Sequence, residues 1–463
     1  MAPEPGSTGT DRDPDPAGGA AGRTGLARLA RLDALALVAS VWFLAKLLRY
    51  AIPPLFGTLQ ASYGVSTALL GTTYSALMIA YAAMQFPSGA LADRIGGARV
   101  VAAGAAVGGA ATLALAVPGS FAALVAGMVL FGIGTGALKT VSVPLIARTY
   151  GSQPGRALGA YDTVGALGGV VAPVAVVALL PDWRRLYLLG GVAGIALAVA
   201  VLVRVSDPEP ASTADSDDDA RTAGGTDDGR RGRRDDEDEG RDGDGAGDAG
   251  TAGAVGGAGD ADRGTDGPGG DGFRAYLSPF RDRRFAAFAV ASVLFTFATG
   301  GVLAFLPLFL ETEAGLSRAT AGTLYGAVFA GSVAQLATGE LGDRIGHLPI
   351  AAGTIAAAFA GLVVVALAPS LPVLAAGVVL LGAGVHGLIP VRGAYMMRVL
   401  PAEVAGGGLG VVRTTFMIGS ALAPALVGAV ADTAGLSVAV WLLAAVAGLA
   451  TLVVAGLFVA GDG

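Results

Sequence analysis

The 463-residue sequence contains no cysteine and only two histidines, His347 and His386. Without cysteine the chain has no disulfide bonds, thiolate nucleophiles or cysteine-ligated metals, and two histidines leave little from which to build a metal site. Charged residues are also scarce, at 14% of the chain, whereas a soluble domain has about 25%. We therefore expect neither a metal nor another cofactor, and the composition excludes a soluble globular protein.

Apolar sequence is abundant instead. Hydrophobic residues make up 53% of the chain, and the mean hydropathy is +0.65. A bilayer core about 30 Å thick requires a helix of about 20 residues, and apolar runs of that size occur six times on each side of a polar gap. They lie at 34–56, 67–91, 98–117, 121–147, 156–181, 185–205, 285–310, 319–341, 348–368, 372–398, 404–431 and 436–460. The pattern predicts an all-α membrane protein with 12 transmembrane helices, six in 33–205 and six in 285–463.

The polar segments differ from these runs in composition. Residues 206–272 contain 20 acidic and seven basic residues, a net charge of −13, which leaves the rest of the chain net positive. Such an Asp/Gly/Ala-rich stretch cannot bury a core, so we expect a disordered linker there. Residues 1–32, rich in Pro, Gly and Ala, are expected to form a disordered tail. The apolar and arginine residues of 273–284 favour a short interfacial segment.

One motif occurs once in each half. The pattern Gly-x-Leu-x-Asp-Arg-x-Gly lies at 89–96 and again at 339–346, and the Gly-rich runs 131–134 and 381–384 are likewise 250 residues apart. The motif resembles the loop signature between the second and third helices of the major facilitator superfamily (MFS) of transporters. The resemblance implies two pseudo-symmetric six-helix bundles and a binding site near the midplane between them, as parallel repeats also suggest.

The signature carries charges suited to a gating or coupling role. Asp93 and Asp343 are expected to cap the positive N-terminus of a neighbouring helix. Arg94 and Arg344 are expected to reach a carboxylate or a lipid phosphate. Arginine-bearing loops alternate along the chain, so the positive-inside rule places the signature loops, both termini and the linker in the cytoplasm, with the chain in the cell membrane.

Few charges lie inside the apolar runs, where each costs about 2.5–3.5 kcal/mol on insertion scales and therefore usually faces a cavity or a partner. The only two lysines of the chain, Lys46 and Lys139, fall in the first and fourth runs. Arg49 shares a helix face with Lys46, about 4.5 Å along the axis. Because the resemblance implies that the first, fourth, seventh and tenth helices line the central cavity, these cations are expected to surround one site.

Three interpretations of these cations remain open. They bind an anionic substrate, they pair structurally with a buried carboxylate such as Asp162, or they take part in proton coupling. His386, on a Gly-rich face of the tenth run, is either packed or part of the same substrate site. Asp162 is the leading candidate for a proton carrier, since burial would raise the pKa of its carboxyl toward neutrality.

Asp162 and Arg413 occupy equivalent positions in the two halves, 251 residues apart. Opposite charges at such positions suggest either a gating role at the bundle interface or local structural pairs. Arg392, near the cytoplasmic mouth, is expected to contact a gate or a lipid phosphate.

We therefore predict a secondary active transporter that moves a small solute, for which we favour an anion, by alternating access. The alternatives are a proton-coupled multidrug or metabolite exporter of the same fold and a non-transporting membrane sensor. No nucleophile–base pair or metal cluster supports an enzyme. The expected partners are a small-molecule substrate, a coupling ion such as a proton, and membrane lipids, with no nucleic acid.

Overall fold

The computed structural model describes residues 17–117, 119–150, 154–180, 182–207, 278–367, 370–399 and 405–460, and in these ranges every regular element is a helix. The first bundle consists of α1 (Ala17–Tyr50), η1 (Pro53–Leu55), α2 (Phe56–Tyr63), α3 (Thr67–Ala83), α4 (Gln85–Ile95), α5 (Gly97–Ala116), α6 (Phe121–Thr149), α7 (Pro154–Ala178) and α8 (Arg184–Arg204). The second consists of η2 (Ser278–Arg281), α11 (Arg283–Thr312), α12 (Arg318–Ala330), η3 (Gly331–Val333), α13 (Ala334–Ile345), α14 (His347–Leu367), α15 (Leu371–Val399), α16 (Ala405–Ala434) and α17 (Leu436–Val459).

The segments outside the bundles differ from expectation where they are described. Helix α1 begins at Ala17, inside the predicted disordered tail 1–32. Of the predicted interfacial segment 273–284, the described part is a single 3-10 turn, η2, followed by the start of α11. The acidic linker, beyond its first two residues, lies outside the described residues.

The predicted all-α membrane fold is confirmed, with one irregular crossing. Among the described residues, 11 segments are long and apolar enough to span a membrane. The eighth predicted run instead forms α12, η3 and α13 in succession, and neither helix exceeds 13 residues. The second crossing has a milder break at Met84, between α3 and α4. In the eighth crossing, η3 separates α12 from α13, so neither of these two short helices reaches spanning length alone.

The two halves repeat at the level of backbone geometry. Gly96 and Gly346, which end the two signatures, both have φ of 97° with ψ of 145° and 149°. This conformation is accessible to glycine because it has no Cβ. A Cβ on Gly134 of α6 would overlap the backbone of α5, and one on Gly384 of α15 would overlap the backbone of α14. The equivalent glycines therefore allow equivalent helix pairs to touch.

Replacing Gly384 with alanine is expected to destabilise the second bundle. The added methyl group would collide with the backbone of Ala358, and overpacking of this kind costs about 1–3 kcal/mol. Gly393→Ala in the same helix is the control, because a Cβ there meets nothing within 4 Å. Thermal unfolding in detergent should show a lower Tm for Gly384→Ala alone, and equal Tm values would contradict the packing argument.

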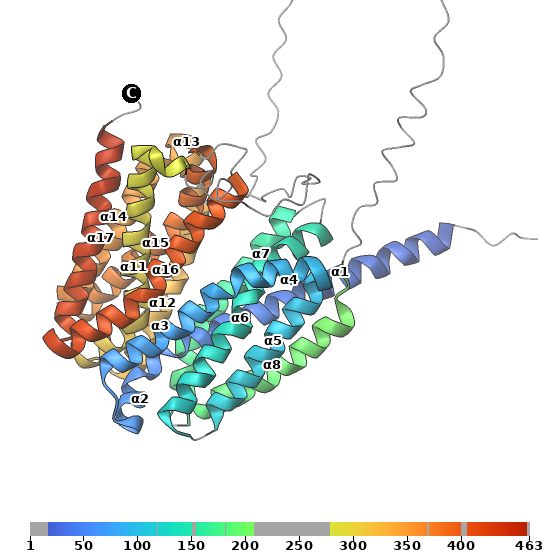
Figure 1. Ribbon diagram of the computed structural model, residues 1–463, viewed down its shortest axis with the longest axis horizontal. Coiled ribbons are helices and arrows are strands. Elements are labelled where there is room, and N and C mark those ends of the chain that lie inside the picture. Colours follow the sequence, from blue (N-terminus) through green and yellow to red (C-terminus); the bar gives the residue numbers. More distant parts are fainter. Residues whose placement is uncertain are drawn as a thin grey trace, which may run out of the picture.

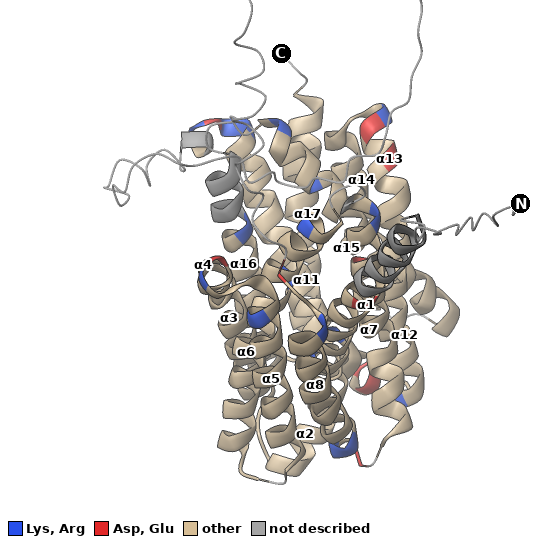
Figure 2. Cartoon of the chain, turned by 90° about the vertical axis from the view of Figure 1, so that its right-hand side faces the viewer, with Lys and Arg blue, Asp and Glu red and all other residues tan. Residues whose placement is uncertain are grey.

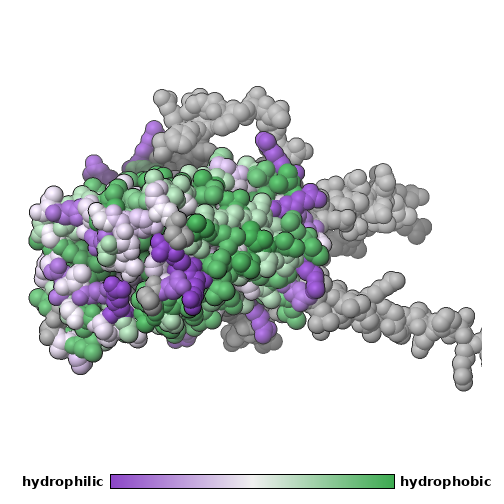
Figure 3. All heavy atoms as spheres, turned by 90° about the horizontal axis from the view of Figure 1, so that it is seen from below, coloured by the Kyte–Doolittle hydropathy of each residue, from purple (hydrophilic) through white to green (hydrophobic). Residues whose placement is uncertain are grey.

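The outer surface of the helices suits a lipid environment. Many large apolar side chains are exposed, including Leu189 at 63%, Val203 at 75% and Leu452 at 71%. Figure 2 shows lysine, arginine, aspartate and glutamate sparsely placed along the helices, and Figure 3 shows apolar side chains over much of the face it presents. Exposed apolar surface of this extent marks an interaction with a membrane or a partner.

The bundles meet at the end that carries α2 and diverge toward the end that carries the signature helices α4 and α13 (Figure 1). At the meeting end α3 packs on α16 and α7 packs on α12. The aromatic rings of Phe56 and Phe305 lie 5.3 Å apart across this junction. The Ser75 hydroxyl accepts a 2.9 Å hydrogen bond from the backbone N–H of Ala425. The structure is thus closed on the α2 side.

A carboxylate from the second bundle strengthens this closure. The two carboxylate oxygens of Asp432, near the end of α16, each accept a 2.9 Å hydrogen bond, from the N–H groups of Thr67 and Ala68. These N–H groups belong to the first turn of α3, where intrahelical partners are lacking. Asp432 therefore caps a helix of the opposite bundle.

Candidate functional site

The predicted cations of the first bundle gather around one indole ring. The Lys46 and Lys139 Nζ atoms lie 5.4 Å and 5.8 Å from the ring centroid of Trp42, and the Arg49 guanidinium carbon lies 5.8 Å from it. Helices α1 and α6 supply these residues, so the tertiary structure brings together two lysines that are far apart in sequence. The cluster, defined here as Trp42, Lys46, Arg49 and Lys139, is called the cation cluster below.

Lys139 has a carboxylate partner within its own bundle. Its Nζ lies 3.0 Å from Oδ1 of Asp162 on α7, and the two side chains are 31% and 55% exposed. A structural pair with Asp162, one of the three open interpretations of the cations, is therefore present and is formed by Lys139. The burial that was expected of Asp162 is not found. Because both side chains are partly exposed, solvent screening weakens this ion pair. Lys139 can therefore exchange Asp162 for another anionic partner.

Arg49 is the most buried charge of the cluster, at 5% exposure. Its guanidinium carbon lies 4.4 Å from the ring centroid of Tyr81 and 5.5 Å from that of Tyr50. Its Nε atom is buried without a hydrogen-bond partner, and no carboxylate of the described residues pairs with it. The aromatic faces attract the cation, yet the Nε–H donor remains for an anion to accept from.

The second bundle completes the surroundings of the cluster. The ring of Phe329 on α12 lies 4.4 Å from the ring of Tyr50 and 6.0 Å from that of His386 on α15. The Nε2 atom of His386 is buried without a hydrogen-bond partner among the described residues. His386 thus lies near the cation cluster, across the junction of the bundles, at the place where the repeat argument puts a binding site.

The charges of the cluster do not cancel. Lys46, Arg49 and Lys139 are three basic residues, and among the described residues Asp162 is the one carboxylate that pairs with them. Around the buried Arg49, a low dielectric strengthens any interaction with an anion. The arrangement can therefore hold a small solute with one or two negative charges.

The signature charges interact only partly as predicted. The N-terminus of α5 is capped by Asp207, whose Oδ1 accepts a 2.8 Å hydrogen bond from the N–H of Ala98, and not by Asp93. Asp93 and Arg94 are exposed. Arg344 reaches a carboxylate, that of Glu340, as predicted, whereas Asp343 lies 3.5 Å from the side chain of His347, at Nε2. His347 itself is 8% exposed.

The remaining predicted charges stay apart. Asp162 pairs with Lys139 and not with Arg413, and Arg413 is exposed. The guanidinium of Arg392 lies 4.6 Å from the ring centroid of Phe416 on α16. Their gating roles stay predictions.

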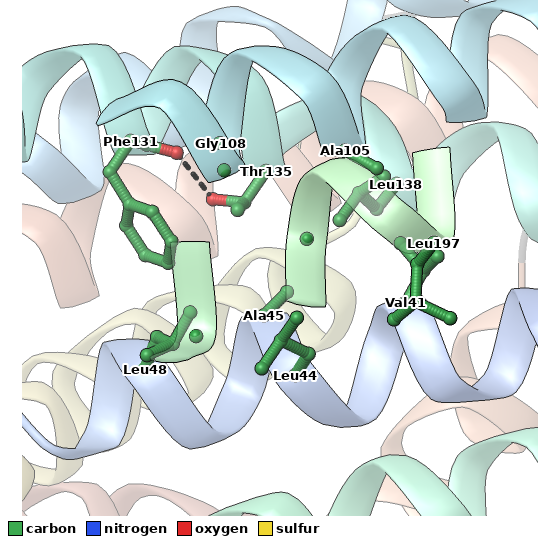
Figure 4. A pocket seen from close by; sticks show the side chains of 13 residues that line it. Val41, Leu44, Ala45, Leu48, Ala105, Gly108, Phe131, Thr135, Leu138 and Leu197 are labelled. Atoms are coloured by element: carbon green, nitrogen blue, oxygen red, sulfur yellow. Dashed lines mark hydrogen bonds between the residues drawn. The ribbon is translucent and has the colours of Figure 1, made fainter. Parts of the chain in front are cut away.

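An apolar pocket inside the first bundle is separate from this site. It is lined by 13 residues of α1, α5, α6 and α8, and its volume is about 20 Å³. Figure 4 shows that the one hydroxyl in the lining, on Thr135, donates to the carbonyl of Phe131 at 2.7 Å. The pocket therefore offers no polar group to orient a charged solute.

Sequence reasoning missed several residues that organise these regions. Trp42, whose ring lies between the three cations, was not singled out. Asp207 and Asp432 were not singled out, because their partners lie 109 and 365 residues away in sequence. The only available signal was their place next to a helix end, which does not specify which helix they cap.

Comparison with known proteins defines the class. The model of the Major Facilitator Superfamily matches residues 38–347 and 288–462, which include both bundles. The chain belongs to this superfamily of membrane transporters.

Individual relatives are more distant. The probable sulfoacetate transporter SauU of Cupriavidus necator is 29% identical over 160 residues, which are 34% of this chain and 37% of that protein. A bacterial homologue of the human lysosomal transporter Spinster, solved inward-facing and unoccupied, has a TM-score of 0.66 at 16% identity, covering 93% of this chain and 97% of that one. The nucleoside transporter NupG has a TM-score of 0.67 at 12% identity, covering 93% and 99%. These structures establish the fold and leave the substrate open.

Proposed function

We propose that this secondary transporter moves a small organic anion, such as a carboxylate or a sulfonate, by alternating access. The observation that carries the proposal is the buried Arg49 guanidinium, whose Nε has no hydrogen-bond partner, which has no carboxylate partner among the described residues, and which has Lys46 one helical turn away. Buried charges of this kind in membrane helices usually mark a substrate or ion pathway. The oxygens of a carboxylate or a sulfonate can accept hydrogen bonds from a guanidinium.

The distant relative supports the same class. Its printed name assigns sulfoacetate, a solute with one sulfonate and one carboxylate, to that protein. A solute with two anionic groups suits a cluster of three basic side chains that has one carboxylate partner among the described residues. His386 would contact the solute from the second bundle, so that binding draws the bundles together.

The structure suggests how an anion would couple to conformational change. The bundles meet on the α2 side and diverge on the signature side, so the site is approached from the signature side. A bound anion would compete with Asp162 for Lys139, whose Nζ lies 3.0 Å from Asp162 Oδ1. Following the positive-inside rule, we propose that the signature side is cytoplasmic, as are both termini, and that the protein resides in the cytoplasmic membrane.

A thermal-shift panel on the purified protein tests the substrate class. Sulfoacetate, acetate and sulfate would be compared with glucose and with the lipophilic cation tetraphenylphosphonium. We expect at least one organic anion to raise the Tm, and we expect Lys46→Gln to weaken its apparent affinity about 10- to 100-fold, as for a lost hydrogen bond to a charged group. Stabilisation by the cation or the sugar alone would contradict the proposal.

The control for Lys46→Gln is Arg185→Gln. Arg185 is 70% exposed and pairs with Asp182 in the loop before α8, far from the cation cluster. Both substitutions remove one positive charge, so only the position differs. Equal loss of anion affinity in both variants would indicate an effect of net charge and would argue against a site at Lys46.

A further inference from the structure

A second polar cavity lies at the signature end of the second bundle, apart from the cation cluster. Its volume is about 620 Å³, and it is enclosed by the ends of α11, α14, α15 and α17. Its lining combines cationic and apolar side chains, among them Arg284, His347, Arg398, Leu348, Leu457 and Phe458. We call it the basic end cavity.

Three basic side chains line the cavity. Nδ1 of His347 lies 3.4 Å from Nη1 of Arg398, and Arg284 lines the cavity from α11. The one acidic residue in the lining, Asp282, directs its carboxylate at the N-terminus of α11, accepting from the N–H groups of Arg284 and Phe285 at 2.7 Å and 2.9 Å. Its charge is therefore engaged by that helix. Nε2 of His347 lies 3.5 Å from the carboxylate of Asp343, and the two arginines outnumber Asp282 in the lining.

The first bundle shows what the equivalent place holds. There the chain after α8 folds against the signature turn, and Asp207 caps α5 through the N–H of Ala98. The carboxylate lies so close to the turn that a Cβ on Gly96 would overlap it. The turn and helix N-terminus of the first bundle thus hold an anion supplied by the chain itself.

The second bundle keeps the turn and lacks that anion. Gly346 has the same φ as Gly96, yet a Cβ there would meet only Pro349, at 3.6 Å. The end of α17 places the apolar residues Leu457 and Phe458 beside the cavity. No carboxylate of the described residues accepts from the N–H of Leu348, the repeat counterpart of Ala98. The same turn and helix N-terminus therefore face an open cavity, which Arg284 and Arg398 also line.

We propose that the basic end cavity binds the phosphate group of an anionic phospholipid from the leaflet on the signature side. Arginine binds phosphate through two parallel hydrogen bonds, and a helix N-terminus favours an anion. Basic pockets between membrane helices are known to accept lipid head groups. The phosphate would take the place that the Asp207 carboxylate takes in the first bundle.

The rim of the cavity indicates a lipid as the source of the phosphate. Ile345 and Phe458 line it and are 60% and 52% exposed. On α17, Leu452 at 71% exposure and Leu449 at 51% continue this apolar surface along the helix. Acyl chains would follow that surface while the head group enters the cavity. A free phosphate would make no use of the apolar rim.

Native mass spectrometry of the full chain in detergent tests the proposal. Phosphatidylglycerol, phosphatidylcholine and inorganic phosphate would be added separately. We expect the protein to retain phosphatidylglycerol in preference to the other two, and we expect Arg398→Gln and His347→Gln each to reduce that retention about 10-fold, as for a lost hydrogen bond to a charged group. Arg398→Lys, which keeps the charge, should retain more phosphatidylglycerol than Arg398→Gln does.

The repeat supplies the control variant. Arg148, at the end of α6, is the counterpart of Arg398 and is exposed. In that bundle the Asp207 carboxylate already caps the helix N-terminus that follows the signature turn. Arg148→Gln should retain phosphatidylglycerol like the unmodified protein. Equal lipid loss in Arg148→Gln and Arg398→Gln would overturn the proposal, as would retention of inorganic phosphate without any lipid preference.

One further outcome separates the lipid from the acidic segment of the chain. Neutralising the acidic run 235–239 with asparagine and glutamine should leave lipid retention unchanged. If retention appears only after this change, the acidic segment occupies the cavity and the lipid proposal is wrong. The test measures lipid retention on folded protein, so its result is independent of whether the cation cluster transports an anion.

Discussion

Replacing Arg49 with glutamine is expected to reduce substrate affinity by about 30- to 5000-fold. The guanidinium is 5% exposed and lies against Tyr81 at 4.4 Å, so an anion bound there would be desolvated. Removing one partner of a buried charge pair costs about 2–5 kcal/mol, which is about 30- to 5000-fold in affinity. Transport of the anion identified by thermal shift, measured in proteoliposomes, should fall correspondingly.

A structural role for Arg49 makes a different prediction. If its cation–π contacts mainly support the fold, Arg49→Gln will lower the Tm of the substrate-free protein. If Arg49 binds substrate, the substrate-free Tm will change little and the anion-induced shift will vanish. Arg49→Lys keeps the charge but loses the planar fork, so it should retain weak binding.

The matched control is Arg184→Gln. Its guanidinium also lies over an aromatic ring, 4.6 Å from the centroid of Trp183, and donates to the hydroxyl of Tyr63 at 3.5 Å. It lies at the α2 end of the first bundle, away from the cation cluster. Anion affinity in this variant should equal that of the unmodified protein, and a comparable loss would remove the special role of Arg49.

Replacing Gly71 with alanine is expected to keep the α2 side from closing. A Cβ at Gly71 would overlap the carbonyl oxygen of Pro424, where α3 crosses α16. The closed arrangement would lose about 1–3 kcal/mol by overpacking, and this shifts an equilibrium between two states by about 5- to 150-fold. Alternating access requires closure on this side, so transport should fall while the protein stays folded.

The absence of cysteine makes this change measurable. Leu308 is 5% exposed and faces the first bundle, because a Cβ on Gly57 would lie 3.7 Å from its Cδ1. In the variant Leu308→Cys the introduced thiol is the only one in the chain. A membrane-impermeant maleimide should label it slowly alone and several-fold faster when Gly71→Ala is added.

Alanine substitutions at two further glycines should change the labelling rate less than Gly71→Ala does. Gly322, the repeat counterpart of Gly71, packs near Pro173, but a Cβ there would meet Val177 at 3.1 Å and Pro173 at 3.6 Å, so Gly322→Ala should have a smaller effect. A Cβ on Gly159 would meet nothing within 4 Å, so Gly159→Ala should have none. Identical labelling rates in all three variants would contradict closure by helix contact at Gly71.

The sequence predicted features that depend on consecutive residues better than contacts between residues far apart in the chain. The apolar runs and the repeated signature predicted the fold correctly, because a membrane helix satisfies its own backbone within about 20 consecutive residues. The grouping of Lys46 with Lys139 rested on the family resemblance and agrees with the geometry around Trp42. That Lys139 is the partner of Asp162 did not follow from the sequence, since periodicity places a charge on a helix without specifying which neighbouring helix it faces.

The sequence alone determined the class of this protein: an all-α chain with two homologous bundles, too poor in charge to be soluble and without cysteine chemistry. Hydropathy and internal repetition are properties of consecutive residues, so they need no coordinates. The tertiary structure alone decided that Lys139 takes Asp162, that Asp207 caps α5, and that Asp432 caps α3 of the other bundle. These contacts join residues 23, 109 and 365 positions apart, and a hydrogen bond forms only where packing brings both atoms to about 3 Å.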